Sequence, residues 1–370
     1  MTLKYIKMQV TAKITGIKYK VICSPDLTKI EFTDFDINEA PSSCIVTDNN
    51  HSYAISKWVS PKRTRSYPYE RVYNTLNFSK KITVIPIIKD EGAKGDRDFI
   101  QWDTVSLMSL LDIFVIFAFY NKADKIGNKI TNQQFDNQYI LEKIKEISQY
   151  HSSALHWNLN ELNMNLHDLI DKSKNFYDKI EKETNVKLHK TSGIERFKNK
   201  IGKDLSLFIL FSREKSENAQ AREFITIQPK ESLATLTKAK ITIMNYLGGK
   251  YFFTVDEIDI AEDAISLIES KHSKNSILPS KGDIKDGLLK MILYSNISEV
   301  DANSKLLKSK AILNLTSVKL EGIIGSESSV KEITEFFISN KFSETQIEFI
   351  ENLFKEANEN QFIVILKNAQ

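Results

Sequence analysis

The sequence has little cysteine and lacks a pattern typical of export. Cys23 and Cys44 are the only cysteines in 370 residues. Two cysteines supply neither a disulfide framework nor a cysteine zinc site, and they suit a reducing compartment. The opening residues Met1–Lys7 are polar and lack the apolar segment of a signal peptide. We therefore expect a cytoplasmic protein.

Long hydrophobic runs and a strong charge of one sign are also lacking. The most apolar stretch, Val105–Tyr120, is interrupted by Asp112 and is shorter than the about 20 residues that span a bilayer. It predicts a buried helix followed by a buried strand, and no membrane partner is expected. The net charge is only +3, so nucleic-acid binding would have to come from local basic patches.

The chain is long enough for two domains, each with its own core. Residues 1–60 contain short β-like runs separated by turns, whereas residues from about 135 to 200 are polar, lysine-rich and helix-periodic. We expect a separate mixed α+β N-terminal domain at 1–200, which ends in a helical connector (about 135–200), and a C-terminal domain at 201–370.

The C-terminal half has a clear order of elements. We expect a helix at 217–227, strands at 238–246, 251–260 and 264–272, a helix at 282–294 and a strand at 311–317. This α-β-β-β-α-β order predicts an α/β core with a mixed central sheet flanked by helices. A helical tail at 329–357 and a final strand at 362–366 follow.

A charged cluster is expected where the second and third of these strands pair. If Glu262-Asp263 form a two-residue turn, Asp256 lies opposite Glu269, and alternation along the strand puts Lys271 on the same face. Opposed like charges destabilise a strand pair, so this arrangement needs a cation. Mg²⁺ held by Asp256 and Glu269 meets that need, with Mn²⁺ as a substitute. Lys271 would orient or deprotonate a water that attacks phosphate.

The register of this hairpin leaves an alternative for the aspartate. A change of one residue in the turn would exchange Asp256 with Asp259, which lies on the other face in the register that we prefer. Without metal, Asp256 and Glu269 are expected to raise each other's pKa, because two ionised carboxylates at close range repel each other.

This pattern resembles the PD-(D/E)xK superfamily, the restriction-endonuclease-like nucleases. That family places an Asp on one core strand and Glu-x-Lys on the next, within an α-β-β-β-α-β order. The resemblance implies metal-dependent cleavage of phosphodiester bonds, with Asp256, Glu269 and Lys271 as catalytic residues and the two carboxylates as metal ligands. It covers residues of about 210–320, and Val255 stands where the family often has a proline.

The resemblance also implies two further residues. The segment Leu289–Tyr294 is similar to the Gln-x-x-x-Tyr helix of the RecB-like branch, and Lys290 stands in the place of that Gln, so only Tyr294 carries over. Some relatives have an acidic residue on the first helix, for which Glu223 is the candidate here.

The N-terminal half contains one local basic patch, Pro61–Arg71. Lys62, Arg63 and Arg65 would contact phosphates or guanine edges, and Tyr67 would stack or pack. The alternative is a solvated loop before a helix.

The acidic glycine loop Asp90–Asp98 is open to two interpretations. It is either a turn and helix start, with Asp98 as the cap and Arg97 in an ion pair, or a DNA-contacting or domain-coupling loop. His151 and His156 are five residues apart, a spacing that favours packing over metal binding on a helix.

Together these features predict a Mg²⁺-dependent deoxyribonuclease that acts on double-stranded DNA, as a type II-like restriction endonuclease. The N-terminal half would read the sequence, because base readout takes contacts beyond the phosphates. A homodimer fits the cutting of both strands, and a cognate DNA methyltransferase is the expected genetic partner. The alternatives are a repair, structure-specific or phage-defence nuclease of the same fold, and a non-catalytic DNA-binding protein on a decayed nuclease fold.

Overall fold

A computed structural model describes residues 9–48, 51–62, 68–201, 206–212, 214, 239–245 and 250–369. The chain has a mixed α/β fold and divides into two compact units. One unit is Pro25–Glu214, and the other combines Met1–Ser24 with Lys215–Gln370. The observed boundary therefore lies beyond the expected one at residue 200, and the first 24 residues join the C-terminal part rather than the N-terminal domain.

The unit Pro25–Glu214 is built on a five-stranded sheet with the order β2-β3-β4-β5-β8. Its strands are β2 (Lys29–Glu31), β3 (Ser43–Thr47), β4 (Ser52–Lys57), β5 (Lys81–Pro86) and β8 (Phe114–Ala118). Only β3 and β4 are antiparallel, and the other neighbours are parallel. All five residues of β8 are buried, as expected for a continuous apolar run in a parallel sheet.

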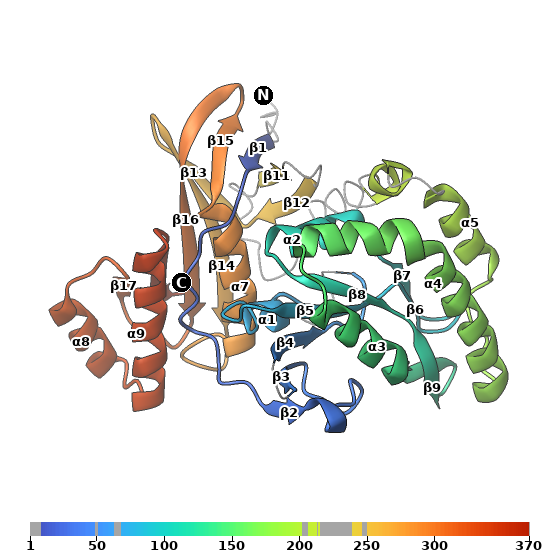
Figure 1. Cartoon of the computed structure of the whole chain (residues 1–370). Coiled ribbons are helices and arrows are strands. Elements are labelled where there is room, and N and C mark those ends of the chain that lie inside the picture. The colour runs from blue at the N-terminus through green and yellow to red at the C-terminus, as the bar shows by residue number, and fades with distance from the viewer. Residues whose placement is uncertain are drawn as a thin grey trace. The chain divides into compact units, whose positions relative to one another are not determined.

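Helices and two small hairpins complete this unit (Figure 1). The helices are η1 (Phe32–Asp34), α1 (Pro68–Tyr73), α2 (Trp102–Leu110), α3 (Asn137–Ser148), α4 (Ala154–Thr184) and α5 (Ser192–Ile201). The hairpins are β6 (Ile88–Asp90) with β7 (Arg97–Phe99), and β9 (Tyr120–Ile126) with β10 (Lys129–Phe135). The expected buried helix and strand at 105–120 are thus confirmed as α2 and β8.

The segment expected as a helical connector is helical but belongs to the core of this unit. The 31-residue helix α4 packs on β8 and β9. Its Asn158 is fully buried, accepts a hydrogen bond from the Val115 backbone at 2.7 Å and donates to the Ile113 carbonyl at 3.0 Å. The connector interpretation was therefore wrong, because a long helix with a polar majority still buries one stripe of side chains.

The other unit is built on a larger mixed sheet, with the order β12-β11-β1-β15-β16-β14-β13 and with β18 and β17 added beside β16. Its strands are β1 (Gln9–Ile14), β11 (Ala239–Asn245), β12 (Lys250–Val255), β13 (Glu257–Ile260), β14 (Ala264–Ser273), β15 (Ile297–Ala302), β16 (Lys305–Ser317), β17 (Ile323–Gly325) and β18 (Ile363–Asn368). The strands expected at 238–246, 264–272, 311–317 and 362–366 are all present as parts of β11, β14, β16 and β18.

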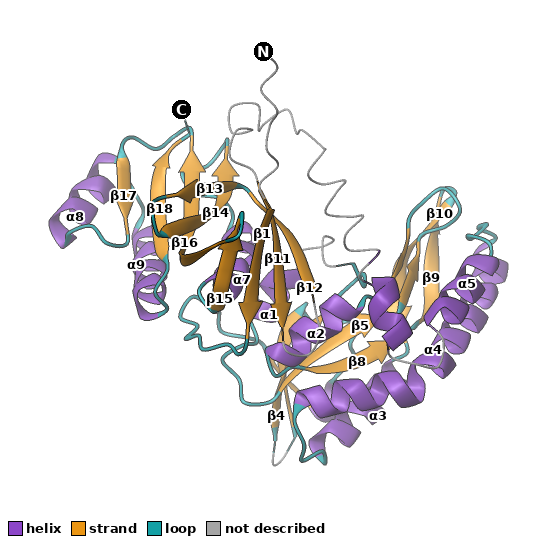
Figure 2. Cartoon of the chain, turned by 90° about the horizontal axis from the view of Figure 1, so that it is seen from above, coloured by secondary structure: helices purple, strands orange, loops and turns teal. Residues whose placement is uncertain are grey.

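The place of β1 in this sheet and a break at Asp256 were not expected from the sequence. Strand β1 lies between β11, to which it is parallel, and β15, to which it is antiparallel (Figure 2). The single strand expected at 251–260 is divided at Asp256 into β12 and β13. These two strands are only one residue apart in the chain, but they lie at opposite ends of the order of strands in the sheet.

Within the described residues of this unit, the sheet is accompanied by the helices α7 (Lys281–Tyr294), α8 (Val330–Ser339) and α9 (Glu344–Glu359). Helix α7 follows β14 in the chain, is itself followed by β15 and then β16, and packs on the parallel strands β14 and β16. The helical tail is divided into α8 and α9, because Lys341 takes a positive φ of 54° and Ser343 caps a new helix. The expected first helix at 217–227 lies outside the described residues. In the described part of the chain, no helix has the length and apolarity to cross a membrane.

Candidate active site

The hairpin of β13 and β14 has the register that the sequence predicts. The Ala261 N–H donates to the Ala264 carbonyl at 2.9 Å, which closes the turn at Glu262-Asp263. Ile260 pairs with Ile265, and the pairing continues to Glu257 and Ile268. The next step along the hairpin brings Asp256 beside Glu269, and the Ser270 N–H donates to Asp256 Oδ2 at 2.9 Å.

Glu269 is the most deeply buried member of the cluster, with 2% of its surface exposed. The Lys271 Nζ lies 3.1 Å from its Oε1. A second lysine, Lys290, places its Nζ 2.8 Å from Oε1 and 2.9 Å from Oε2. Asp256, Glu269 and Lys271 are therefore brought together as predicted, and a second cation joins them.

Helix α7 contributes two residues that the sequence analysis did not assign to the site. Asp286 accepts a hydrogen bond from Lys271 Nζ at 2.9 Å, and Lys290 follows one turn later on the same face of the helix. The helix approaches closely at Gly287, where a Cβ atom would lie 2.8 Å from Leu313 Cδ1 and 3.3 Å from Lys271 Cε. The spacing of four residues, directly after a Glu-x-Lys strand, was the signal that could have identified this pair.

The two carboxyl groups of the cluster have opposite pKa shifts. Burial, and then repulsion by Glu269, raises the pKa of Asp256 to about 6. Burial alone would raise the pKa of Glu269 as well, but Lys290 and Lys271 together hold it below its usual value. The expectation that each carboxyl group raises the pKa of the other is therefore correct for Asp256 and wrong for Glu269, because two ammonium groups neutralise the latter.

The lysines respond to the same charges. Burial alone would lower the pKa of Lys290, but the Glu269 carboxylate raises it well above its usual value. The pKa of Lys271 is also raised, because Glu269 and Asp286 outweigh its burial. Both lysines are therefore cationic at neutral pH, and the site is a network of charges rather than a set of neutral groups.

The residues present fit a hydrated divalent ion better than an ion that the protein alone encloses. Among the residues that the structure describes, no group of three or more His, Cys, Asp or Glu side chains could hold a metal. Magnesium, however, is usually bound by one or two carboxylates together with waters and phosphate oxygens. Asp256 and Glu269 provide two such carboxylates, and burial and then Glu269 raise the pKa of Asp256 although Lys290 and Lys271 act against the shift.

The remaining candidates for the site have different positions. Asp259 is exposed on β13 and pairs with Ser266, away from the buried cluster, which favours Asp256 as the active residue. Tyr294 is buried at the end of α7 and contributes electrostatically to the raised pKa of Lys290. Glu223 lies outside the described residues.

The predicted basic patch is described only in part. Lys62 is half-buried, and its backbone N–H donates to Ser60 Oγ at 3.2 Å. Arg63, Arg65 and Tyr67 lie outside the described residues, so the patch stays a prediction.

The acidic glycine loop is a structural hairpin. Asp90 is 2% exposed, lies 2.8 Å from His189 Nδ1 and accepts from the Gly92 N–H at 2.9 Å. Arg97 lies 3.7 Å from its other oxygen, so the expected ion pair of Arg97 is present. The expected capping role of Asp98 is wrong, because α2 begins at Trp102, after Gln101 as its N-cap.

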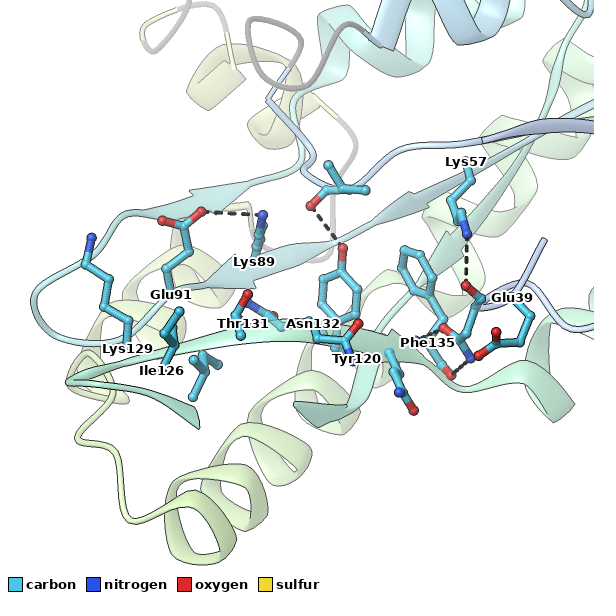
Figure 3. A pocket seen from close by; sticks show the side chains of 15 residues that line it. Glu39, Lys57, Lys89, Glu91, Tyr120, Ile126, Lys129, Thr131, Asn132 and Phe135 are labelled. Atoms are coloured by element: carbon cyan, nitrogen blue, oxygen red, sulfur yellow. Dashed lines mark hydrogen bonds and ion pairs between the residues drawn. The ribbon is translucent and has the colours of Figure 1, made fainter. Parts of the chain in front are cut away.

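A hollow lies among the described residues of each unit. In the unit of the charged cluster, a hollow of about 590 Å³ is lined by His272, the residue after Lys271, and by Lys274 and Lys281. In the other unit, a groove of about 470 Å³ lies beside the β9–β10 hairpin (Figure 3). Two of the cations that line it have internal partners: Lys89 pairs with Glu91 at 3.4 Å, and Lys57 donates to backbone carbonyls.

Comparison of the chain with protein-family models, with curated proteins and with solved structures found no match. The functional argument therefore depends on the geometry of the charged cluster.

Proposed function

We propose that this protein is a metal-dependent nuclease of the PD-(D/E)xK type, which hydrolyses phosphodiester bonds of DNA. The observation that carries this proposal is the placement of Asp256, Glu269 and Lys271 at one buried position of two paired strands. The arrangement around it supports the proposal: β14 is antiparallel to β13, parallel to β16 and joined to β16 through α7 and then β15.

The residues of the cluster would divide the reaction between them. Asp256 and Glu269 would hold Mg²⁺, with Mn²⁺ as a substitute. The bound ion would supply a water of lowered pKa and positive charge beside the phosphate. Lys271, fixed by Asp286 at 2.9 Å, would orient the attacking water and offset the negative charge that develops on the phosphate. As the water oxygen bonds to phosphorus, the bond to the leaving oxygen breaks.

Within this class we propose a type II-like restriction endonuclease. The unit Pro25–Glu214 has its own sheet and helices, which provide the additional surface that base readout needs. Cutting both strands of a palindromic site takes two active sites, so we propose a homodimer and, as a genetic partner, a methyltransferase that protects the host DNA.

Replacement of Lys271 by alanine tests the proposal. Lys271→Ala should reduce cleavage of double-stranded DNA in Mg²⁺ by at least about 100-fold, because one electrostatic contributor to the transition state is lost. DNA binding should change less than about twofold, since the residue acts on the reacting phosphate rather than on affinity. Plasmid digestion and gel-shift titration measure the two quantities.

Lys305→Ala is a matched control, because Lys305 also lies in this sheet and pairs with Asp263 at 3.6 Å, but is largely exposed. Cleavage at the normal rate by Lys271→Ala would show that the active site is wrongly assigned. Sequence-independent products would favour a repair, structure-specific or phage-defence nuclease. No cleavage of varied DNA in Mg²⁺ or Mn²⁺ would favour a non-catalytic DNA-binding protein.

A further inference from the structure

Lys290 occupies the position at which the proposed metal would contact Glu269. We propose that the Lys290 ammonium is an internal substitute for the divalent ion, and that the ion binds only when this ammonium leaves Glu269. The inference depends on the proposed function, because it concerns the same carboxylate pair. It adds a competing cation that controls how easily the site takes up metal.

The contacts of Glu269 are the first argument. A carboxylate has about four acceptor positions on its two oxygens. Lys290 contacts both oxygens, at 2.8 and 2.9 Å, and Lys271 contacts one of them at 3.1 Å. The position between the two oxygens is therefore filled by Lys290. A magnesium ion lies about 2.0–2.1 Å from its oxygen ligands, so it cannot share that position with an ammonium group.

The charge of the cluster is the second argument. Glu269 and Asp286 are in contact with the ammonium groups of Lys271 and Lys290, and Asp256 interacts electrostatically with this set. Three carboxylates and two ammonium groups leave one negative charge in excess when all are ionised. A divalent ion added to this set would turn the excess into a positive charge. If Lys290 withdraws, the remaining charge is two negative, and one divalent ion balances it.

The side chain of Lys290 can make this movement. Lysine has a flexible four-carbon stem, and 17% of the Lys290 side chain is exposed, so part of the side chain reaches solvent. Lys271 is different, because Asp286 holds its ammonium from the other side at 2.9 Å. Of the two lysines, Lys290 is therefore the one that the ion would displace.

The metal affinity of the full-length protein, measured without DNA, tests the inference. Isothermal titration with Mn²⁺ should show that Lys290→Gln binds the ion at least about tenfold more tightly than the unaltered protein, because the competing charge is gone. Lys143→Gln is a matched control, since Lys143 is also a buried lysine, 3.1 Å from the buried Glu161 in the other unit. Its Mn²⁺ affinity should be unchanged. Equal or weaker Mn²⁺ binding by Lys290→Gln would overturn the inference.

A second variant separates this inference from the proposed function. Glu269→Gln should lose Mn²⁺ binding if the ion occupies the carboxylate pair. Unchanged binding by Glu269→Gln would refute the metal site itself, and with it the proposed function. Loss of binding by Glu269→Gln, combined with unchanged binding by Lys290→Gln, would leave the proposed function standing and refute only the role of Lys290.

A measurement on the unaltered protein covers the case in which Lys290→Gln does not fold. The rate at which acetic anhydride acetylates Lys290, followed by mass spectrometry, should rise several-fold when Mn²⁺ saturates the protein. The rate for Lys143 should not change. An acetylation rate of Lys290 that is the same with and without Mn²⁺ would overturn the inference.

Discussion

Glu269, Glu161 and Glu356 are deeply buried carboxylates whose partners explain very different roles. Glu161 pairs with Lys143, and Glu356 accepts from the Tyr19 hydroxyl at 2.7 Å and from two backbone N–H groups. Those carboxylates are satisfied by fixed internal partners, as buried charges in a core must be. Glu269 instead belongs to a network with more carboxylates than cations. In this network the pKa of Asp256 is raised, and shifted pKa values of this kind cluster at functional sites.

The pKa of Asp256 leads to a prediction about pH and metal binding. The pKa is raised to about 6, so the ionised form that binds metal predominates above that pH and is lost below it. Glu269, with its lowered pKa, stays ionised throughout this range. Mn²⁺ affinity should therefore be constant above about pH 7 and should fall up to about tenfold per pH unit below the pKa, because one proton competes with the ion.

Calorimetric titration of Mn²⁺ between about pH 5 and pH 8 measures this dependence. Asp256→Asn should bind the ion more weakly and should show almost no dependence on pH in that interval, since the competing proton is gone. Affinity that is the same at pH 5 and pH 7 in the unaltered protein would contradict a site that includes Asp256.

At this scale the sequence was informative where the pattern is local. Asp256, Glu269 and Lys271 could be placed together because one turn and the alternation of side chains determine their positions. Asp286 and Lys290 could not, because the face of α7 that meets the sheet depends on packing, in particular at Gly287. Because Lys290 was not assigned to the site, the lowered pKa of Glu269 was not predicted either.

Single elements were predicted best where they have strong internal periodicity. Strand β14, helix α7 and strand β18 lie where the sequence indicates, whereas the β15–β16 hairpin was not expected. Its turn residues Asn303 and Ser304 have positive φ values, and it pairs over only a few residues, so its signal is weak. The helices at 135–200 were identified, but their packing on the sheet could not be inferred from a polar composition.

The β9–β10 hairpin is the element from which we predict DNA contacts of the N-terminal unit. Two-stranded ribbons fit the major groove of DNA. The three lysines of this hairpin, Lys122, Lys125 and Lys129, are all exposed, and Lys129 lines the groove of Figure 3. The triple change to alanine should weaken DNA binding at least about tenfold and reduce the salt slope by up to about 3, because each lost phosphate contact removes about 0.9.

Gel-shift or fluorescence titrations at several salt concentrations measure both quantities. The matched control replaces three exposed lysines of the same unit that lie at the end of α4 and beyond it, Lys179, Lys182 and Lys187. If the two triple variants bind DNA equally well at every salt concentration, the β9–β10 hairpin is not the contact surface.

At the scale of the whole molecule, the unit that contains the charged cluster is discontinuous in sequence. Strand β1 pairs with β11, more than 200 residues later, and also with β15. The segment that follows β1 is held by Glu356 of α9, which binds Tyr19 and the backbone of Ile22 and Cys23. Local sequence patterns cannot identify such pairing, because the pattern of β1 fits any half-buried strand. We therefore expected a domain boundary at residue 200 and assigned β1 to the N-terminal domain.

The discontinuity predicts that the C-terminal segment cannot fold without the N-terminus. Without residues 1–24, both β11 and β15 lose their neighbour and expose unpaired strand edges. The fully buried Val10 and Ile14 are also lost, at about 1.5–3 kcal/mol each, and the buried Glu356 loses its hydrogen bonds from Tyr19, Ile22 and Cys23. A fragment of residues 215–370 should therefore be largely unfolded or aggregated, by circular dichroism and by thermal unfolding.

A fusion that joins residues 1–24 through a flexible linker to residue 215 is the decisive comparison, because it restores β1 and adds nothing from the other unit. It should unfold cooperatively on heating, and it should bind Mn²⁺ if the carboxylate pair is complete within this unit. If the fragment without residues 1–24 unfolds with the same midpoint as the fusion, then β1 is dispensable, and the C-terminal part is an independent domain of the kind that the sequence first indicated. If only the fusion folds, the strand at the start of the chain is part of the platform that carries Asp256 and Glu269.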